Sequence, residues 1–257
     1  MKFGILGALK EEIELILTTM TAIKNIEHGN NTFYCGTIDQ HSVVLVSSGM
    51  GKVAAASTAT SLISYFNVDE IIVTGLAGAI SATLNIGDIV ISDTLYFHDM
   101  NAQPLYPKHE IPGTHISSFN ADSVLISTAK TTAIRFLENI HDAIEQHTLA
   151  EFNITNTPQC HIGTIATGDQ FIHCKEHAQK IINDRPDTLA LEMEGAAVAQ
   201  VCYNHKIPFV IIRIIADLAD HNAEHNFTKF IHLLAKEYSK HIVTDMLANT
   251  RNSAHAH

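Results

Sequence analysis

Two neighbouring stretches decide the fold: Leu191-Glu192-Met193-Glu194-Gly195-Ala196-Ala197-Val198-Ala199 and Phe209-Val210-Ile211-Ile212-Arg213-Ile214-Ile215-Ala216-Asp217. The second stretch is nearly all apolar and rich in β-branched residues, which predicts a buried strand. Because side chains alternate along a strand, Arg213 and Asp217 are expected on the same face. A buried charge needs a partner, and Glu194 at the start of the intervening helix is the natural one for Arg213. The pattern fits either a structural ion pair or a catalytic pocket at the carboxyl ends of the strands of an α/β sheet.

The composition is that of an ordinary α/β protein with an acidic surface. A chain of 257 residues can bury one large core, and 46 % of its residues are hydrophobic and 17 % charged. The net charge of −11 argues against a nucleic-acid partner, since phosphates require a basic surface. No apolar run is long enough to span a bilayer, so no membrane partner is expected. Glu11 and Glu12 follow the short apolar N-terminus at once, which favours a first strand over a signal peptide.

Cysteine and histidine spacing predicts no metal site. The four cysteines have no CxxC spacing and lie mostly in apolar surroundings, which is typical of reduced thiols in a cytoplasmic protein. His221 and His225 have a spacing that could bind metal on a helix. They fall in a polar loop, however, so we expect no metal ion there.

Strand-like and helix-like runs alternate along a single domain that we assign to residues 1–257, with 249–257 as a flexible tail. Strands are expected at 2–8, 32–38, 42–47, 70–75, 88–96, 159–167, 188–192 and 208–216. Helices are expected at 10–21, 52–65, 122–147, 175–183, 195–205 and 227–248. This alternation predicts a mixed, mainly parallel central sheet with helices on both faces. A hairpin is expected around Asp39-Gln40, and residues 100–120 form a long proline-bearing loop.

Two glycine-rich segments follow predicted strands. Gly49-Met50-Gly51-Lys52-Val53-Ala54 fits the dinucleotide pattern G-x-G-x-x-G/A. That fingerprint needs an acid at the far end of the next strand, whereas Asp69 and Glu70 stand at its beginning. We therefore expect no nicotinamide cofactor. The segment and a second predicted turn, Thr74-Gly75-Leu76-Ala77-Gly78, are interpreted as places where backbone approaches a ligand closely.

Two further positions have both a structural and a functional interpretation. Glu11 and Glu12 lie in the first turn of a predicted helix, where acids stabilise the helix dipole. One of them could instead turn into the cleft as a general base. Phe171 follows the strand that ends near Thr167, and it could pack in the core or stack on a flat base.

Together these motifs resemble those of the 5′-methylthioadenosine/S-adenosylhomocysteine nucleosidases, over nearly the whole chain. The resemblance is carried by the following segments: Gly4–Ala8 with Glu11-Glu12, Ser48–Ala56, Thr74–Gly78, Gly87–Val90, His98-Asp99, Thr167–Ile172, Glu192–Ala196 and Arg213–Asp217. It implies the purine nucleoside phosphorylase-like fold and a homodimer. It also implies hydrolysis of adenine nucleosides in methionine salvage, without a cofactor.

The resemblance also assigns roles to residues. Glu12 is expected to activate water, Asp217 to protonate the leaving adenine at N7, and Glu194 to hold the ribose hydroxyls with help from Met193. Arg213 supports the acids. Phe171 and Ile172 contact adenine, Met50 and Phe227 line the 5′-thioalkyl pocket, and Ala77 and Gly78 contact the substrate. The stretch 98–103 is expected to close the neighbouring subunit's pocket. Leu76 and Ala216 depart from the family, which commonly has Ser at both positions.

Three other functions fit the sequence less well. A nucleoside phosphorylase must bind a phosphate dianion, usually with Arg, yet the chain has no Arg before Arg135. A nicotinamide-dependent oxidoreductase is disfavoured by the misplaced acid, and a non-catalytic nucleoside-binding module would not need Glu12, Glu194 and Asp217 together. The sequence does not rank methylthioadenosine, adenosylhomocysteine, 5′-deoxyadenosine and aminodeoxyfutalosine as substrates.

Overall fold

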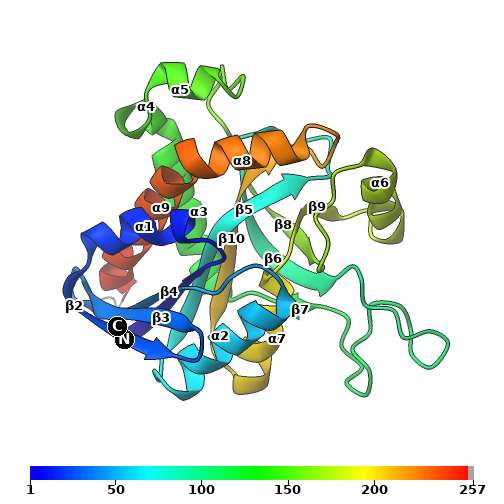
Figure 1. Cartoon of the computed structure of the whole chain (residues 1–257), viewed down its shortest axis with the longest axis horizontal. Helices are drawn as coiled ribbons and strands as arrows, with labels where there is room; N and C mark the ends of the chain where they lie inside the picture. The colour runs from blue at the N-terminus through cyan, green and yellow to red at the C-terminus, as the bar shows by residue number, and fades with distance from the viewer. Residues whose placement is uncertain (254–257) are drawn as a thin grey trace.

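A ten-stranded mixed sheet runs through the centre of the computed structural model, which describes residues 1–253 (Figure 1). Its strands are β1 (Lys2–Gly7), β2 (Thr21–His28), β3 (Asn31–Ile38), β4 (His41–Ser47), β5 (Glu70–Ala79), β6 (Ile89–Phe97), β7 (Phe119–Asn120), β8 (Cys160–Thr167), β9 (Thr188–Glu192) and β10 (Phe209–Asp217). Its helices are α1 (Lys10–Thr19), α2 (Lys52–Ser64), α3 (Ser123–Glu138), α4 (Ile140–Ala143), α5 (Gln146–Ala150), α6 (Lys175–Asp184), α7 (Gly195–His205), α8 (Ala223–Leu233) and α9 (Ala235–Ser253).

The sheet closes on itself at one side and stays open at the other. Strands β5, β10, β6, β8 and β9 pair in a ring, because β5 pairs with both β10 and β9. Strands β1, β4, β3 and β2 extend the sheet from β5. Parallel pairs such as β1–β5 and β5–β10 mix with antiparallel ones such as β6–β10. The hairpin expected around Asp39-Gln40 is confirmed, since Ile38 pairs with His41 across β3 and β4.

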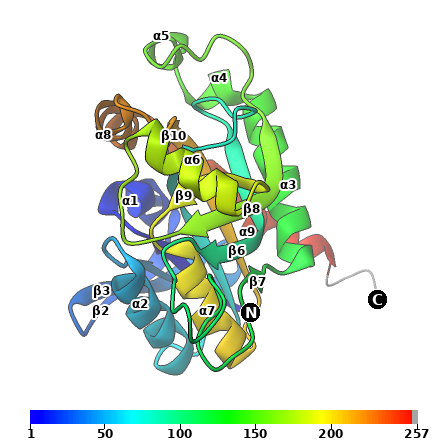
Figure 2. The same cartoon turned by 90° about the vertical axis from the view of Figure 1, so that its right-hand side faces the viewer.

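Helices cover both faces of the sheet, as the sequence predicts (Figure 2). Helices α2 and α7 pack on one face, while α1, α3 and α9 pack on the other. The alternation along β10 explains this division, because Ile211 and Ile215 join the α2–α7 core whereas Ile212 and Ile214 join the α1–α3–α9 core. Strand β10 is therefore buried on both sides, which is why its sequence is nearly all apolar.

Several elements differ from the sequence-based expectations. Strand β2 was not predicted, because its side chains are mostly exposed and lack apolar alternation. The single helix expected over 122–147 breaks at Asn139, whose φ of −116° and ψ of 24° leave the helical region. The helix expected over 227–248 starts earlier and divides at Leu234 into α8 and α9. Helix α9 includes residues 249–253 of the expected tail, and 254–257 lie outside the described residues.

The predicted second glycine turn is wrong: Thr74 to Gly78 continue strand β5, which runs to Ala79. The glycines are needed for another reason. A Cβ atom at Gly75 would lie 2.2 Å from Arg213 Nη1 and 2.8 Å from Glu12 Oε1, and one at Gly78 would lie 2.7 Å from Asp217 Oδ1. Glycine at these positions makes room for charged side chains of neighbouring elements.

No helix within residues 1–253 combines the length and apolar character that a bilayer crossing requires.

Candidate active site

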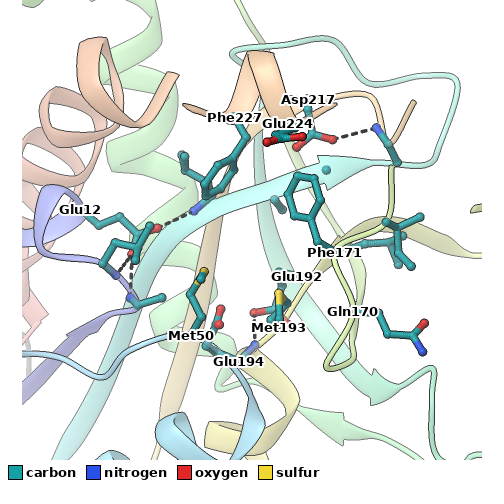
Figure 3. Close-up of a pocket in the computed structure, with 18 residues that line it drawn as sticks. Glu12, Met50, Gln170, Phe171, Glu192, Met193, Glu194, Asp217, Glu224 and Phe227 are labelled. Carbon is teal, nitrogen blue, oxygen red and sulfur yellow. Dashed lines mark hydrogen bonds between the residues drawn. The ribbon is translucent and has the colours of Figure 1, made fainter. Parts of the chain in front are cut away.

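A cavity of about 400 Å³ opens where the carboxyl ends of β1, β5, β8, β9 and β10 meet (Figure 3). It is lined by Ala8, Leu9, Glu12, Met50, Leu76, Ala77, Gly78, Gln170, Phe171, Ile172, Leu191, Glu192, Met193, Glu194, Asp217, Ala219, Glu224 and Phe227. Ten of the eleven site residues expected from the sequence are in this set, and Arg213 lies behind it. The position agrees with the rule that α/β sheets bind ligands at the carboxyl ends of their strands.

Glu12 enters the cavity from the first turn of α1 (Figure 3). Its Oε2 accepts hydrogen bonds from the backbone N–H groups of Ala8 at 2.6 Å and Leu9 at 2.8 Å, and its Oε1 from Leu76 at 3.1 Å. Burial raises the pKa of Glu12, although the Arg213 charge and the three N–H donors oppose the rise. Glu11 does not line this cavity. Of the two neighbouring acids, Glu12 is thus the one that faces the candidate site.

Arg213, Glu192 and Glu194 form a buried cluster of charges beside the cavity. Arg213 Nη2 lies 3.2 Å from Glu194 Oε2 and also contacts Glu192 Oε2, so the expected Arg213–Glu194 pair forms. Burial, reinforced by the Glu192 charge, raises the pKa of Glu194 against the opposing effects of Arg213 and the Gly51 N–H. Glu194 Oε1 accepts that N–H at 2.8 Å.

Glu192 is a member of the cluster to which the sequence analysis gave no role. Its carboxylate accepts hydrogen bonds from the N–H groups of Glu194 at 3.0 Å and Gly195 at 2.6 Å, as well as from the Thr167 hydroxyl. These donors belong to the start of α7 and the end of β8. The signal that could have revealed it is charge balance: two acids at one strand end stand opposite one buried arginine.

Asp217 lies at the other side of the cavity from Glu12, at the end of β10 (Figure 3). Its Oδ1 accepts a hydrogen bond from the Ala219 N–H at 2.8 Å. Burial raises the pKa of Asp217 to about 6, with Asp220 adding to the rise and the Ala219 N–H opposing it. A carboxyl group with such a pKa keeps its proton over more of the neutral range than an exposed aspartate.

Apolar side chains form the remaining walls. Phe171 and Phe227 meet edge to face, with ring centroids 5.7 Å apart and an interplanar angle of 76°. Phe171 is 42 % exposed and Met50 59 % exposed, so both present surface that a flat or apolar ligand could cover. Ile172 and Met193 also line the cavity. The wall residues that the sequence analysis did not single out as ligand contacts include Gln170 and Glu224, which follow a strand end and a polar loop.

Two sets of residues stay outside this chain's cavity. No residue from 98 to 103 lines it, although this stretch was expected to act on a neighbouring subunit. In the described part of the chain, no three His, Cys, Asp or Glu side chains gather to hold a metal ion, and His221 and His225 form no such group.

Comparison with known proteins assigns the chain to a family. The phosphorylase superfamily matches residues 2–248, a range that contains every residue of the cavity. A 5′-methylthioadenosine/S-adenosylhomocysteine nucleosidase of Staphylococcus aureus (strain JH9) is 35% identical over 238 residues, which cover 92% of this chain and 95% of the relative. The chain belongs to this nucleosidase family of the phosphorylase superfamily.

Solved structures of the nucleosidase family share this fold. A nucleosidase from Colwellia psychrerythraea 34H in complex with adenine is 35% identical, with a TM-score of 0.85 over 96% of this chain and 95% of that one. A futalosine hydrolase of Helicobacter pylori strain 26695 is 30% identical, with a TM-score of 0.81 over 96% of this chain and 97% of that one. The expected family and the nucleoside phosphorylase-like fold are confirmed.

Proposed function

We propose that this nucleosidase hydrolyses the N-glycosidic bond of 5′-methylthioadenosine and S-adenosylhomocysteine, releasing adenine and the 5′-thio-substituted ribose. The observation that carries the proposal is the presence of Glu12, Glu194 and Asp217 around one cavity, each on a different element. Water must attack C1′ from one face of the ribose while adenine leaves from the other. A base and an acid on separate elements meet that requirement.

The three carboxyl groups have complementary roles in this reaction. Glu12 accepts a proton as the water oxygen bonds to C1′, and the electron pair of the breaking C1′–N9 bond moves onto adenine. Asp217 donates its proton to N7 of the departing base, for which its raised pKa is suited. Glu194 accepts hydrogen bonds from the 2′- and 3′-hydroxyls and stabilises the positive charge that develops on the ribose. Arg213 holds Glu194 from behind the cavity.

The apolar walls would bind the rest of the substrate. Phe171 stacks on adenine, and Ile172 contacts the base edge. Met50 and Phe227 cover the 5′-thioalkyl group, with Met193 under the ribose. Ala77 and Gly78 contribute backbone from β5 beside Asp217, where the absence of a Cβ at Gly78 leaves room.

Hydrolysis is favoured over phosphorolysis because the cavity offers no cation for phosphate. None of the described residues that line it is Lys or Arg, and the nearby Arg213 is already paired with Glu192 and Glu194. The test is to incubate the protein with methylthioadenosine with and without phosphate. We expect adenine and free methylthioribose in both cases, whereas a phosphate-dependent reaction that yields a sugar 1-phosphate would contradict the proposal.

Aminodeoxyfutalosine is a second candidate substrate, favoured by the likeness to a futalosine hydrolase. It shares adenine and ribose with methylthioadenosine but carries a benzoate on its 5′ side. The cavity is lined by the carboxyl groups of Glu12, Glu192, Glu194, Asp217 and Glu224. Within residues 1–253, no Lys or Arg lines the cavity to pair with an anionic 5′ group, which disfavours the benzoate. A panel of the two nucleosides with adenosylhomocysteine and 5′-deoxyadenosine should therefore give the lowest kcat/KM for aminodeoxyfutalosine.

We also propose the setting of the enzyme. It acts in methionine salvage in the cytoplasm, as a homodimer that needs no metal or organic cofactor. All four cysteines are free, which suits a reducing compartment. The homodimer is supported by exposed apolar side chains at the cavity and on the adjoining helix α2, Met50 and Val53.

A further inference from the structure

Three charged residues form a closed ring of hydrogen bonds at the rim of the cavity. Lys52 begins α2, Asp99 follows β6, and Asp169 follows β8. Lys52 Nζ lies 2.6 Å from Asp99 Oδ2 and 3.5 Å from Asp169 Oδ2. The Asp169 N–H donates to the same Asp99 oxygen at 3.0 Å, and the Lys52 N–H donates to Asp169 Oδ1 at 2.8 Å. Each member therefore bonds both of the others.

The ring also completes the start of helix α2. No side chain caps this helix from its own N-cap residue, Gly51. Its first two N–H groups instead go to carboxylates from other loops, Gly51 to Glu194 and Lys52 to Asp169. Carboxylates at a helix N-terminus are stabilised by the dipole and satisfy free N–H groups. Gly51 has a φ of 96°, and a Cβ there would lie 3.1 Å from Asp169 Oδ1, so the geometry of this junction is restricted.

The three residues of the ring do not line the cavity, but they lie next to residues that do. Gly51, which precedes Lys52 in the chain, donates its N–H to Glu194, which we assign to the ribose. Asp169 belongs to the loop that carries Phe171, which we assign to adenine. Neither Lys52 nor Asp99 is among the lining residues. The Lys52 ammonium joins the segments that follow β6 and β8 through Asp99 and Asp169. The Lys52 backbone N–H joins Asp169 to the start of α2, where Gly51 holds Glu194.

An isolated ion pair on a protein surface adds little stability. In this ring the Asp169 side chain is 48% exposed, but the Lys52–Asp99 pair is partly shielded from water. The side chains of Lys52 and Asp99 are 24% and 19% exposed, and Lys52 Nζ lies 5.5 Å from the centre of the Phe97 ring. Burial acts to raise the pKa of Asp99, yet the hydrogen bonds from Lys52 and the Asp169 N–H hold it below its usual value. Charge-assisted bonds that are partly shielded from water and linked to backbone are stronger than exposed pairs.

We propose that Lys52 is a positioning residue for nucleoside binding, which holds the adenine loop 168–172 at a fixed separation from the ribose carboxylate Glu194 through its contacts with Asp99 and Asp169. This proposal rests on the proposed function, because it concerns how the same site binds adenine and ribose together. Without the ammonium, the two aspartates repel each other, and of the ring's bonds only the one from the Lys52 backbone N–H to Asp169 Oδ1 still joins the loop to α2.

The test uses three variants and one control in the full-length protein. Lys52→Met keeps the length of the side chain but removes its charge, and Lys52→Arg keeps the charge. Asp99→Asn keeps one side-chain oxygen that can accept these bonds, replaces the other oxygen with an NH2 group and removes the negative charge. Lys236→Met is the matched control, because Lys236 is also a partly buried lysine, 33% exposed, that pairs with Glu14 of another element and does not line the cavity.

Each variant is measured for KM and kcat on methylthioadenosine and for the dissociation constant of adenine. Hydrogen exchange of residues 168–172 in the ligand-free protein is measured as well. For Lys52→Met we expect KM and the adenine dissociation constant to rise about tenfold, kcat to stay within about threefold, and exchange to accelerate in this loop. Lys52→Arg should recover most of the affinity. Because Lys52 and Asp99 act in one ring, combining Lys52→Met with Asp99→Asn should cost less than the sum of the two changes.

Two results would overturn the inference. One is a Lys52→Met protein whose KM, adenine affinity and loop exchange match those of Lys236→Met. The other is a uniform loss of kcat and thermal stability without a change in KM, which indicates a general structural role. Failure of the wild-type protein to hydrolyse methylthioadenosine would refute the proposed function instead, and the exchange measurement would still test the role of Lys52 in holding the loop.

Discussion

Asp217 is the residue whose protonation should limit the reaction at neutral pH. As the proposed acid it must carry a proton, and its pKa is raised to about 6 by burial. The protonated fraction falls as the pH rises through this value, so kcat/KM should decline above about pH 6, approaching tenfold per pH unit. A pH profile of methylthioadenosine hydrolysis measures this limb.

Asp217→Asn preserves the shape of the side chain and the acceptor for the Ala219 N–H but removes the proton. We expect kcat to fall by about 10²- to 10⁴-fold, with adenine affinity changed far less and the alkaline limb assigned to Asp217 lost. Near-normal turnover in this variant would show that another group is the acid.

Glu11 and Glu12 offer a natural control pair, because they are adjacent on α1 but about 100° apart around its axis. Glu12 is buried in the cavity and bonded to three N–H groups, whereas Glu11 is outside it. Glu12→Gln should lower kcat by about 10²-fold or more, and Glu11→Gln should leave it nearly unchanged. Steady-state assays of both variants decide the matter, and equal small losses would return Glu12 to the role of a helix-capping acid.

The residues of the site could be predicted to different degrees. The Arg213–Glu194 pair could be predicted, because a charge within an apolar strand needs a partner and the preceding helix begins with an acid. Glu192 was not predicted because its partners, two backbone N–H groups of a helix start, the Thr167 hydroxyl and Arg213, are brought together only by the fold. Distances across the cavity depend on strand pairing between distant segments, for which the sequence carries no local signal.

At the scale of elements, a large side chain on β10 restricts which residue can stand opposite it on β5. Gly75 pairs with Arg213 in the register of β5 and β10. Gly75→Ala would place a Cβ 2.2 Å from Arg213 Nη1, so the guanidinium and Glu12 must shift. We expect kcat/KM to fall at least about tenfold, with a loss of about 1–3 kcal/mol in the free energy of unfolding.

Gly4→Ala in the adjacent strand β1 is the matched control for this change. Its Cβ would meet only apolar side-chain atoms of Leu62, Val68 and Ile71 at 3.2–3.4 Å. Activity should therefore be kept in Gly4→Ala, whatever its effect on the melting temperature. If Gly75→Ala were as active as Gly4→Ala, the contact between Gly75 and the Arg213 guanidinium would not be needed for activity.

Buried elements were predicted better than exposed ones, and the reason is physical. Strand β10 is apolar except for Arg213 and Asp217 because both its faces are covered, and α7 was predicted at its observed bounds. Strand β2 is held by pairing with β3 at the open edge of the sheet, so its composition carries no burial pattern. The extension of β5 through two glycines was missed because glycine usually indicates a turn, and only the packed neighbours reveal its other use.

At the scale of the whole molecule, the cavity opens next to apolar surface that one chain leaves uncovered. Val53 on α2 is 81% exposed, Leu105 in the long loop is 83% exposed, and Met50 at the cavity itself is 59% exposed. Leu76 and Ala77 add nothing to this surface, since they are buried in β5. Met50 lines the cavity at the proposed 5′-thioalkyl position, and Val53 follows three residues later on α2, so a second copy of the chain is the cover that we propose.

Dilution of the protein should therefore reduce activity on methylthioadenosine before it unfolds the chain, because separated subunits lose one wall of the pocket. Val53→Asp puts a charge into the proposed interface and should raise the dimer dissociation constant at least about 100-fold, with activity recovered at high protein concentration. Val124→Asp on α3 is the control, since Val124 is also exposed, at 64%, but lies on the opposite face of the sheet. Sedimentation at the assay concentration gives the oligomeric state of each variant. A fully active monomer would refute both the dimer and the shared pocket, since a complete wall would then have to come from the single chain.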